Sequence, residues 1–419
     1  MKKFFLFCMM ALVTMCGLNS CSDDCDHEFI EYDYNKALVG TWTCLHEGYA
    51  EAIVINADGS VLSTGVEDGE YWENIKGNIK TVNNKMTLTF EDNDNFEGRF
   101  EMLSGVAFTI YEEDGESFTY SYCEKDLSKE IVGMWVCTDS PLEAENDMVI
   151  HTYQEDGYCL KTGFSEGAND FIVNNKAPYK VVGDLIFVER PADILTNGMV
   201  SHIVYHLNYI PNGTAFGDIL VTPGYTFNGN EYVSLTYSWL RIKQYLELKG
   251  MKYDYIKTFV SNVKGLDKDI EFMGTTFNFA KMDGVKLDKM LKTLLFTVEF
   301  PDANTIKYGC HYNNEPMSME APIAVDGNKM TVKMSQKNAA YRDIDLYTFQ
   351  DQDNTQMHMY MHSTAFVNFF GNMQLTIMDQ LGMIDTTDAA AVKAVFDSID
   401  EAVETINVSF VMTKSTKAI

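Results

Sequence analysis

The residue best placed for a defined chemical reaction is Cys21, whose thiol follows a leader of the export type. Two lysines open the chain, residues 4–13 are apolar, and Leu18-Asn19-Ser20 brings small residues up to the cysteine. A positive start, a short apolar segment and a small cleavage site are typical of a secretory signal peptide. The apolar segment is too short to span a bilayer. The sequence therefore predicts a signal peptide over residues 1–20.

The stretch from Leu18 to Cys21 resembles the bacterial lipobox, in which the cysteine thiol is acylated and becomes the first residue of the mature protein. The resemblance implies a lipid anchor on Cys21. Stable anchoring takes two or more acyl chains, because each buried CH₂ group adds only roughly 0.8 kcal/mol. A secreted protein with a free thiol near the cut is the alternative.

An acidic tether over residues 21–37 follows the expected lipidation site. Its segment Ser22-Asp23-Asp24-Cys25-Asp26 resembles the surface-export tag of Bacteroidetes lipoproteins. That resemblance implies a chain anchored in the outer membrane and facing the cell exterior. An ordinary solvated linker is the alternative, since a short acidic run is easily hydrated.

The net charge of -29 excludes one class of partner. A chain this acidic repels nucleic acid, and no basic stripe offsets the charge. The acidic residues are spread along the sequence, which indicates solubility more than a specific acidic site. A length of 419 residues predicts two or three domains.

Two parts of the chain repeat the same landmarks in the same order. The pairs are 38–44 with 131–137, Asp58-Gly59 with Asp156-Gly157, 63–65 with 161–163, and 82–85 with 173–176. Asp-Gly is a hairpin turn signal, and the segments between such turns alternate or run apolar over strand length. Each copy therefore predicts a meander of short antiparallel strands.

Both copies open with Gly-x-Trp, as Gly40-Thr41-Trp42 and Gly133-Met134-Trp135. This motif, ahead of a run of hairpins, resembles the opening of lipocalin-like (calycin) barrels. The resemblance implies a mainly β fold of tandem meander barrels, with units over 38–126 and 131–247, the Trp closing each floor. It also implies a calyx for a hydrophobic or small organic ligand. Unit one is short for such a carrier, and a small barrel can fill its interior with side chains.

The region 251–419 lacks the Gly-x-Trp opening, but the sequence predicts further strands in it, over 270–279, 296–300, 305–310, 329–334, 342–349 and 355–362. Two amphipathic helices are expected near its end. The apolar positions of the first run from Phe366 to Leu381, and those of the second from Val392 to Ile406, with Asp388 as an N-cap. We expect a third, divergent barrel with inserted helices and a last strand over 407–413.

Alternation around residue 360 predicts a strand with two different faces. Met357, Met359 and Met361 share one face, while His358, Tyr360 and His362 share the other. The histidines lie about 13 Å apart along a strand, too far to hold one metal ion. A polar outer face over a methionine-rich core is the simpler interpretation. An adaptable apolar pocket is the alternative, since methionine tolerates varied ligand shapes; it is formed by Met357, Met359, Met361, Phe366 and Phe370.

Cys44 and Cys123 lie in the first and last predicted strands of unit one. If this unit closes into a barrel, the two strands are neighbours and a disulfide is geometrically feasible. Such a bond would stabilise the unit by roughly 2–4 kcal/mol. Buried free thiols are the alternative.

No catalytic motif supports an enzyme, because nucleophile elbows, His-Glu-x-x-His and phosphate-binding glycine loops are all missing from the sequence. The segment 92–95 lacks the ligands of a calcium loop. We expect no bound metal ion and no cofactor. Two functions remain: a surface-tethered binding module for a small apolar or amphipathic ligand, and a structural or interaction lipoprotein that contacts a protein or glycan. An empty calyx favours the first and filled barrels favour the second.

Overall fold

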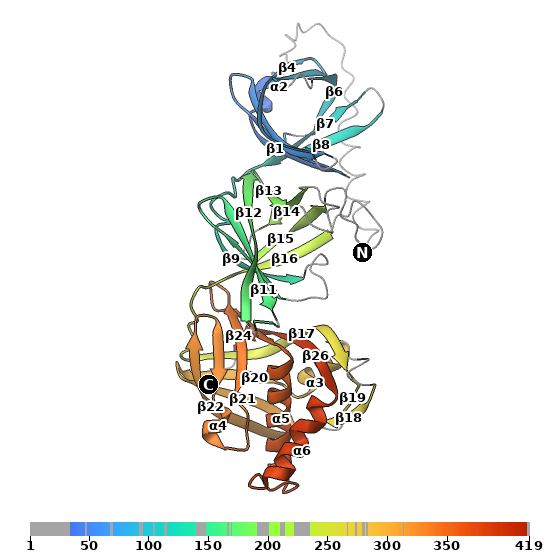
Figure 1. Ribbon diagram of the computed structural model, residues 1–419. Helices are drawn as coiled ribbons and strands as arrows, with labels where there is room; N and C mark the ends of the chain where they lie inside the picture. The colour runs from blue at the N-terminus through green and yellow to red at the C-terminus, as the bar shows by residue number, and fades with distance from the viewer. Residues whose placement is uncertain are drawn as a thin grey trace, which may run out of the picture.

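Three closed, antiparallel, eight-stranded barrels form a column in the computed structural model (Figure 1). The structure describes residues 34–416, except 47, 68–69, 92–94, 104, 113–114, 140–147, 166, 169, 191–200, 210–213, 222–234, 266, 273–274, 279–280, 282–283 and 313. The prediction of a mainly β fold of meander barrels is confirmed. Among the described helices, none is both long and apolar enough to cross a bilayer.

Barrel 1 is an up-and-down meander in which each strand pairs with the next and β1 pairs with β8. Its strands are β1 (Gly40–His46), β2 (Tyr49–Ile55), β3 (Ser60–Glu67), β4 (Glu70–Val82), β5 (Lys85–Phe90), β6 (Asn95–Leu103), β7 (Ala107–Tyr111) and β8 (Ser117–Cys123). The short helix α2 (Tyr34–Ala37) precedes them and packs Tyr34 edge-on against Phe100.

Barrel 2 repeats this topology, and β16 pairs with β9 to close it. Its strands are β9 (Gly133–Asp139), β10 (Val149–Tyr153), β11 (Tyr158–Ser165), β12 (Asp170–Val182), β13 (Leu185–Arg190), β14 (Ser201–Tyr209), β15 (Thr214–Val221) and β16 (Leu235–Ile242). One repeat landmark is not equivalent in the structure: residues 82–85 form the β4–β5 turn, whereas 173–176 lie within β12. These two segments are therefore not at equivalent positions in the two barrels.

Barrel 3 closes by pairing its first strand with its last. Its strands are β17 (Met251–Gly265), β20 (Thr297–Asp302), β21 (Thr305–Tyr312), β22 (Glu315–Asp326), β23 (Lys329–Val332), β24 (Ile344–Gln350), β25 (Gln356–Met361) and β26 (Val403–Lys414). A separate hairpin of β18 (Asp269–Phe272) and β19 (Thr275–Asn278) follows β17. The helices are α3 (Gly284–Thr293), α4 (Met334–Lys337), α5 (Ser363–Gln380) and α6 (Ala389–Asp400).

The two helices expected near the end are α5 and α6, inserted between β25 and β26. The Asp388 carboxylate accepts hydrogen bonds from the backbone N–H groups of Ala390 and Ala391, which confirms it as the N-cap. Helix α5 is buried on almost every side, so it belongs to the core of barrel 3. Strands β17 and β22 and helix α3 were not predicted, and the single strand expected over 270–279 is a hairpin.

The two Gly-x-Trp segments have the same local geometry. Trp42 and Trp135 are fully buried, and the indole N–H of each donates to the carbonyl oxygen four residues earlier, at 2.7 and 2.6 Å. Gly40 and Gly133 have φ angles of 142° and 139°, which side chains rarely adopt. Each indole therefore ties the start of its barrel to the segment that leads into it.

Two apolar seams join the barrels side to side. The first seam packs Ala50, Ala52 and Val66 of barrel 1 against Leu185, Phe187 and Val204 of barrel 2. The second seam packs Val136, Met148, Ile150, Leu240 and Ile242 of barrel 2 against Tyr347, Phe349 and Tyr360 of barrel 3. Outward-facing side chains of the barrel walls are thus buried where the walls meet. This burial removes apolar area from water and holds each barrel against its neighbour.

Candidate functional site

The interiors of barrels 1 and 2 are filled by their own aromatic side chains. In barrel 1, Trp42 and Phe108 pack with ring centroids 5.0 Å apart. In barrel 2, the Trp239 ring lies 4.9 Å from Tyr205 and 5.6 Å from Tyr153. Filled interiors of this kind are typical of small barrels with short strands.

One polar cluster lies inside barrel 1, around the buried carboxylate of Glu51. Tyr49, Tyr120 and Ser63 each donate a hydroxyl hydrogen bond to this carboxylate. Trp72 Nε1 in turn donates to Ser63 Oγ at 2.7 Å. Burial and the Glu51 charge raise the pKa of both tyrosines, so both remain neutral donors. The cluster satisfies its own hydrogen bonds and forms part of the barrel filling.

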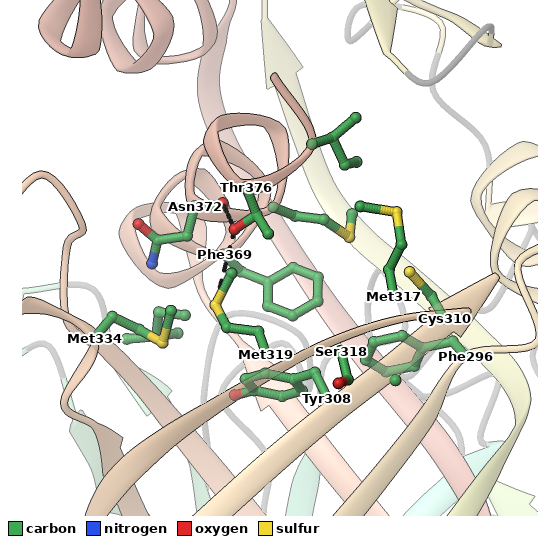
Figure 2. A pocket seen from close by; sticks show the side chains of 14 residues that line it. Phe296, Tyr308, Cys310, Met317, Ser318, Met319, Met334, Phe369, Asn372 and Thr376 are labelled. Carbon is green, nitrogen blue, oxygen red and sulfur yellow. Dashed lines mark hydrogen bonds between the residues drawn. The ribbon is translucent and has the colours of Figure 1, made fainter. Parts of the chain in front are cut away.

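Barrel 3 contains an apolar cavity of about 50 Å³ between α5 and the strands β21 and β22 (Figure 2). It is lined by Phe296, Tyr308, Gly309, Cys310, Met317, Ser318, Met319, Met334, Ile344, Phe369, Asn372, Met373, Thr376 and Ile377. Alternation along β21 and β22 turns Cys310 and Met317 to the same face as Tyr308 and Met319, which pair across the strands. Four methionines make this lining deformable.

Tyr308 lines this cavity and carries a buried hydroxyl. Its side chain is only 8% exposed, and no described residue makes a hydrogen bond with its buried hydroxyl. Burial raises the pKa of Tyr308, so the phenol stays neutral and can donate or accept. A buried hydroxyl without a partner costs about 1–3 kcal/mol, which a bound polar group would recover.

Two other polar side chains at the cavity, those of Thr376 and Asn372, are already engaged within the protein. Thr376 Oγ1 donates to the carbonyl oxygen of Asn372 at 2.8 Å. The Asn372 side chain bonds both the N–H and the carbonyl oxygen of Arg342, at 3.0 and 2.7 Å. These bonds fix α5 against the segment before β24, so the wall of the cavity on the helix side is held in place.

The residues expected from the sequence to form an apolar pocket are not the residues that line the observed cavity. The structure places Met357, Met359, Met361, Phe366 and Phe370 in the core of barrel 3, and none of them lines the cavity. The cavity lies instead against Phe369 of α5 and against methionines of β22 and α4. Strand β22 was not predicted from the sequence. The alternation that places Met317 and Met319 on one face of this strand would have indicated it.

The expected polar outer face of β25 does point away from the core of barrel 3, but it is not exposed. Tyr360 lies in the second seam, and His358 and His362 are 2% and 8% exposed. The His362 ring stacks on Phe164 of barrel 2 at 5.0 Å. Strand alternation identifies the face of a side chain, whereas the barrel packed against that face could not be predicted from it.

Cys44 and Cys123 are free thiols in the structure. Strands β1 and β8 are neighbours as expected, but Cys123 pairs with Thr41 on one face of the wall, while Cys44 points to the other, into the barrel core. The expectation of a disulfide is corrected on this ground, because a bond would have to cross the wall. Burial raises the pKa of each thiol to about 12, so neither is a reactive thiolate.

Cys21 and the tether before residue 34 lie outside the described residues. Within the described part of the chain, no three His, Cys, Asp or Glu side chains converge in a way that could hold a metal ion.

No protein-family model matches this chain, and no curated protein matches it either. Among solved structures, a Tyr-167-Ala and Trp-176-Ala double mutant of Transferrin Binding Protein B from Haemophilus parasuis Hp5 is 11% identical. That match covers 89% of this chain and 67% of the other, with a TM-score of 0.24. The Trp-176-Ala mutant of the same protein is 10% identical, over 88% and 66%, with a TM-score of 0.21. Likeness at these TM-scores supports no conclusion about function.

Proposed function

We propose that this chain is a non-catalytic binding lipoprotein that takes a small apolar molecule with one hydrogen-bonding group into the cavity of barrel 3. The observation that carries the proposal is the buried hydroxyl of Tyr308, which makes no hydrogen bond with any described residue and belongs to a side chain of the methionine-rich lining. A ligand that offers a hydroxyl or carbonyl oxygen to Tyr308 would recover the hydrogen bond that burial has removed.

The size of the cavity limits the ligand. Typical small-molecule sites enclose about 300–1,000 Å³, far more than the 50 Å³ present here. The ligand must therefore be slender, and Met317, Met319 and Met373, which are partly exposed, must move to admit it. Met side chains have three rotatable bonds and can do so at low cost.

The binding test compares octanol with octane on the mature chain, by calorimetry and thermal shift. Octanol should bind more tightly than octane, and Tyr308→Phe should weaken octanol binding by about tenfold while leaving octane unchanged. Cys310→Met, which fills the cavity, should abolish both. Tyr111→Phe in barrel 1 is the matched control, because it removes an exposed hydroxyl. Equal octanol binding in the wild type and Cys310→Met would exclude this site.

A second candidate function is favoured by the filled interiors of barrels 1 and 2 and by the two seams. In this case the column is a rigid scaffold whose outer loops contact a glycan or a protein. A glycan array probed with the wild type and with Cys310→Met separates the two candidates. A signal that Cys310→Met leaves unchanged favours the scaffold, and no signal in either protein counts against it.

The anchoring proposed for Cys21 has its own test. Metabolic labelling with palmitate should mark the wild type, while Cys21→Ser should remain unlabelled and be released from membranes. Protease applied to intact cells should digest the mature chain if it faces the exterior. Full protection would contradict the outward orientation without affecting the lipid.

A further inference from the structure

Barrel 2 has an open pocket at one of its ends, which we call the hollow. Leu127 and Ile131 pack into the core of the barrel at this end. The hollow has a volume of about 670 Å³, within the range of small-molecule sites. The linker that leads into barrel 2, the β10–β11 turn and the strands β12 and β16 surround it. It is separate from the apolar cavity of barrel 3, so a ligand in this hollow is independent of the function proposed for that cavity.

The charge of this hollow is opposite to the charge of the chain. Its lining includes the cationic residues Lys129, Lys180 and Arg241, and Glu155 is the one acidic residue among the described residues that line it. The whole sequence has 61 acidic and 32 basic side chains. At physiological ionic strength the distant acidic residues are screened beyond about 8 Å, so an anion in the hollow responds mainly to the charges that line it. These are three cations and Glu155.

Arg241 provides the most specific group. Its Nη2 donates to the carbonyl oxygen of Val132 at 2.6 Å, and its guanidinium lies 5.8 Å from the centroid of the Trp135 ring. No carboxylate within the described part of the chain pairs with it, and its buried Nε–H has no hydrogen-bond partner there. A partly buried guanidinium without a counter-charge is unfavourable, and its planar fork matches an oxyanion.

The two lysines that line the hollow differ in their partners. Lys180 is held in place by Glu73 of barrel 1, with Nζ 3.1 Å from Oε1. Lys129 is exposed and forms no ion pair with any described residue. Its positive charge is therefore available to a ligand, whereas that of Lys180 is partly neutralised.

We infer that this hollow binds the oxyanion group of a small ligand, of the phosphate class. Arg241 would donate hydrogen bonds to the oxyanion from its planar guanidinium, and Lys129 would add the positive charge of its ammonium group. The same group could come from free phosphate, from a phosphorylated sugar or from a lipid headgroup, and the experiment distinguishes these sources.

The experiment titrates the mature chain at low ionic strength with inorganic phosphate, glucose 6-phosphate and phosphatidylglycerol vesicles. We expect glucose 6-phosphate to bind more tightly than phosphate, and added salt to weaken both. Lys129→Glu should weaken the binding of glucose 6-phosphate by about tenfold or more. The matched control is Lys125→Glu, an exposed residue of the same linker outside the hollow, which should change affinity by less than about twofold.

The outcomes separate a site from a general charge effect. Selective loss in Lys129→Glu, with an unchanged melting temperature, supports the site. Equal loss in both variants, or no binding of any of the three probes, would overturn it. Binding of the vesicles alone, lost in Lys129→Glu, would support the site with a lipid headgroup as the source of the oxyanion. Arg241→Lys gives a second check, since it keeps the charge, removes the fork and should also weaken glucose 6-phosphate binding.

Discussion

The phenol of Tyr347 on β24 donates a hydrogen bond of 2.6 Å to the carboxylate of Asp170 on β12, and so joins barrel 3 to barrel 2 across the second seam. The ring of Phe171 lies 4.7 Å from that of Tyr347 and packs beside the bond. A polar contact is thus set into an apolar interface, where it specifies how the two walls align.

Tyr347→Phe should weaken this alignment. Loss of a hydrogen bond to a charged acceptor at a partly buried position is expected to lower the free energy of unfolding by about 1–2 kcal/mol. Urea unfolding followed by tryptophan fluorescence measures the change. Tyr111→Phe, which removes an exposed bond to Glu101, should stay within about 0.5 kcal/mol. Equal effects of the two variants would show that the seam does not depend on Tyr347.

Stability should fall with acid because burial keeps histidines neutral in the folded chain, among them His202 and His358. His202 stacks on Tyr71 with ring centroids 4.0 Å apart in the first seam, and His358 is buried on the outer face of β25. Burial lowers the pKa of each from 6.5 to about 4. Between these values the unfolded chain takes up protons that the folded chain excludes, so stability is complete above about pH 6.5 and is lost as pH falls toward about 4.

Urea midpoints measured at pH 7.5 and pH 5 test this dependence. His202→Phe keeps the ring stack and removes the titrating group, so the difference between the two midpoints should shrink. His46→Gln, at an exposed position, is the control and should retain the full difference. A wild-type midpoint that is equal at both pH values would contradict the prediction.

The Glu51 cluster predicts a stability effect in barrel 1. Glu51→Gln replaces one acceptor oxygen with a donor, so at least one surrounding hydroxyl loses its partner. We expect a loss of about 1–3 kcal/mol in the free energy of unfolding, measured in urea. Glu101→Gln, on the exposed outside of the same barrel, should have little effect. No change in Glu51→Gln would mean that the cluster contributes no net stability.

Gly40→Ala should destabilise barrel 1. A Cβ atom at this position would lie 2.5 Å from the Tyr122 ring, and the φ of 142° is unfavourable for alanine. Backbone strain of this kind costs about 1–3 kcal/mol. Gly167→Ala is the control, since a Cβ there would meet nothing within 4 Å. Thermal unfolding of both variants measures the difference, and equal melting temperatures would contradict the strain.

The features predicted correctly from the sequence depend on neighbours along the chain. The Asp388 N-cap and the Asp-Gly turns at Gly59 and Gly157, with φ angles of 82° and 81°, need only a few adjacent residues. The cavity could not be predicted, because Tyr308 and Phe369 are far apart in sequence and meet only when barrel 3 closes around α5. The seams were missed for the same reason, since alternation gives a face and not its partner.

The closure of barrel 3 has a consequence for its folding. Strand β26 pairs on one side with β25 and on the other with β17, at the opposite end of the barrel sequence. During synthesis from the N-terminus, the other seven strands can form only an open sheet with two unpaired edges until β26 emerges. Such edges recruit other strands, and distant pairings form slowly. Barrels 1 and 2 close in the same way, but the chain between the closing strands is longest in barrel 3, over 251–414 against 40–123 and 133–242. Barrel 3 therefore keeps its edges open longest and most needs protection from aggregation while it is being made.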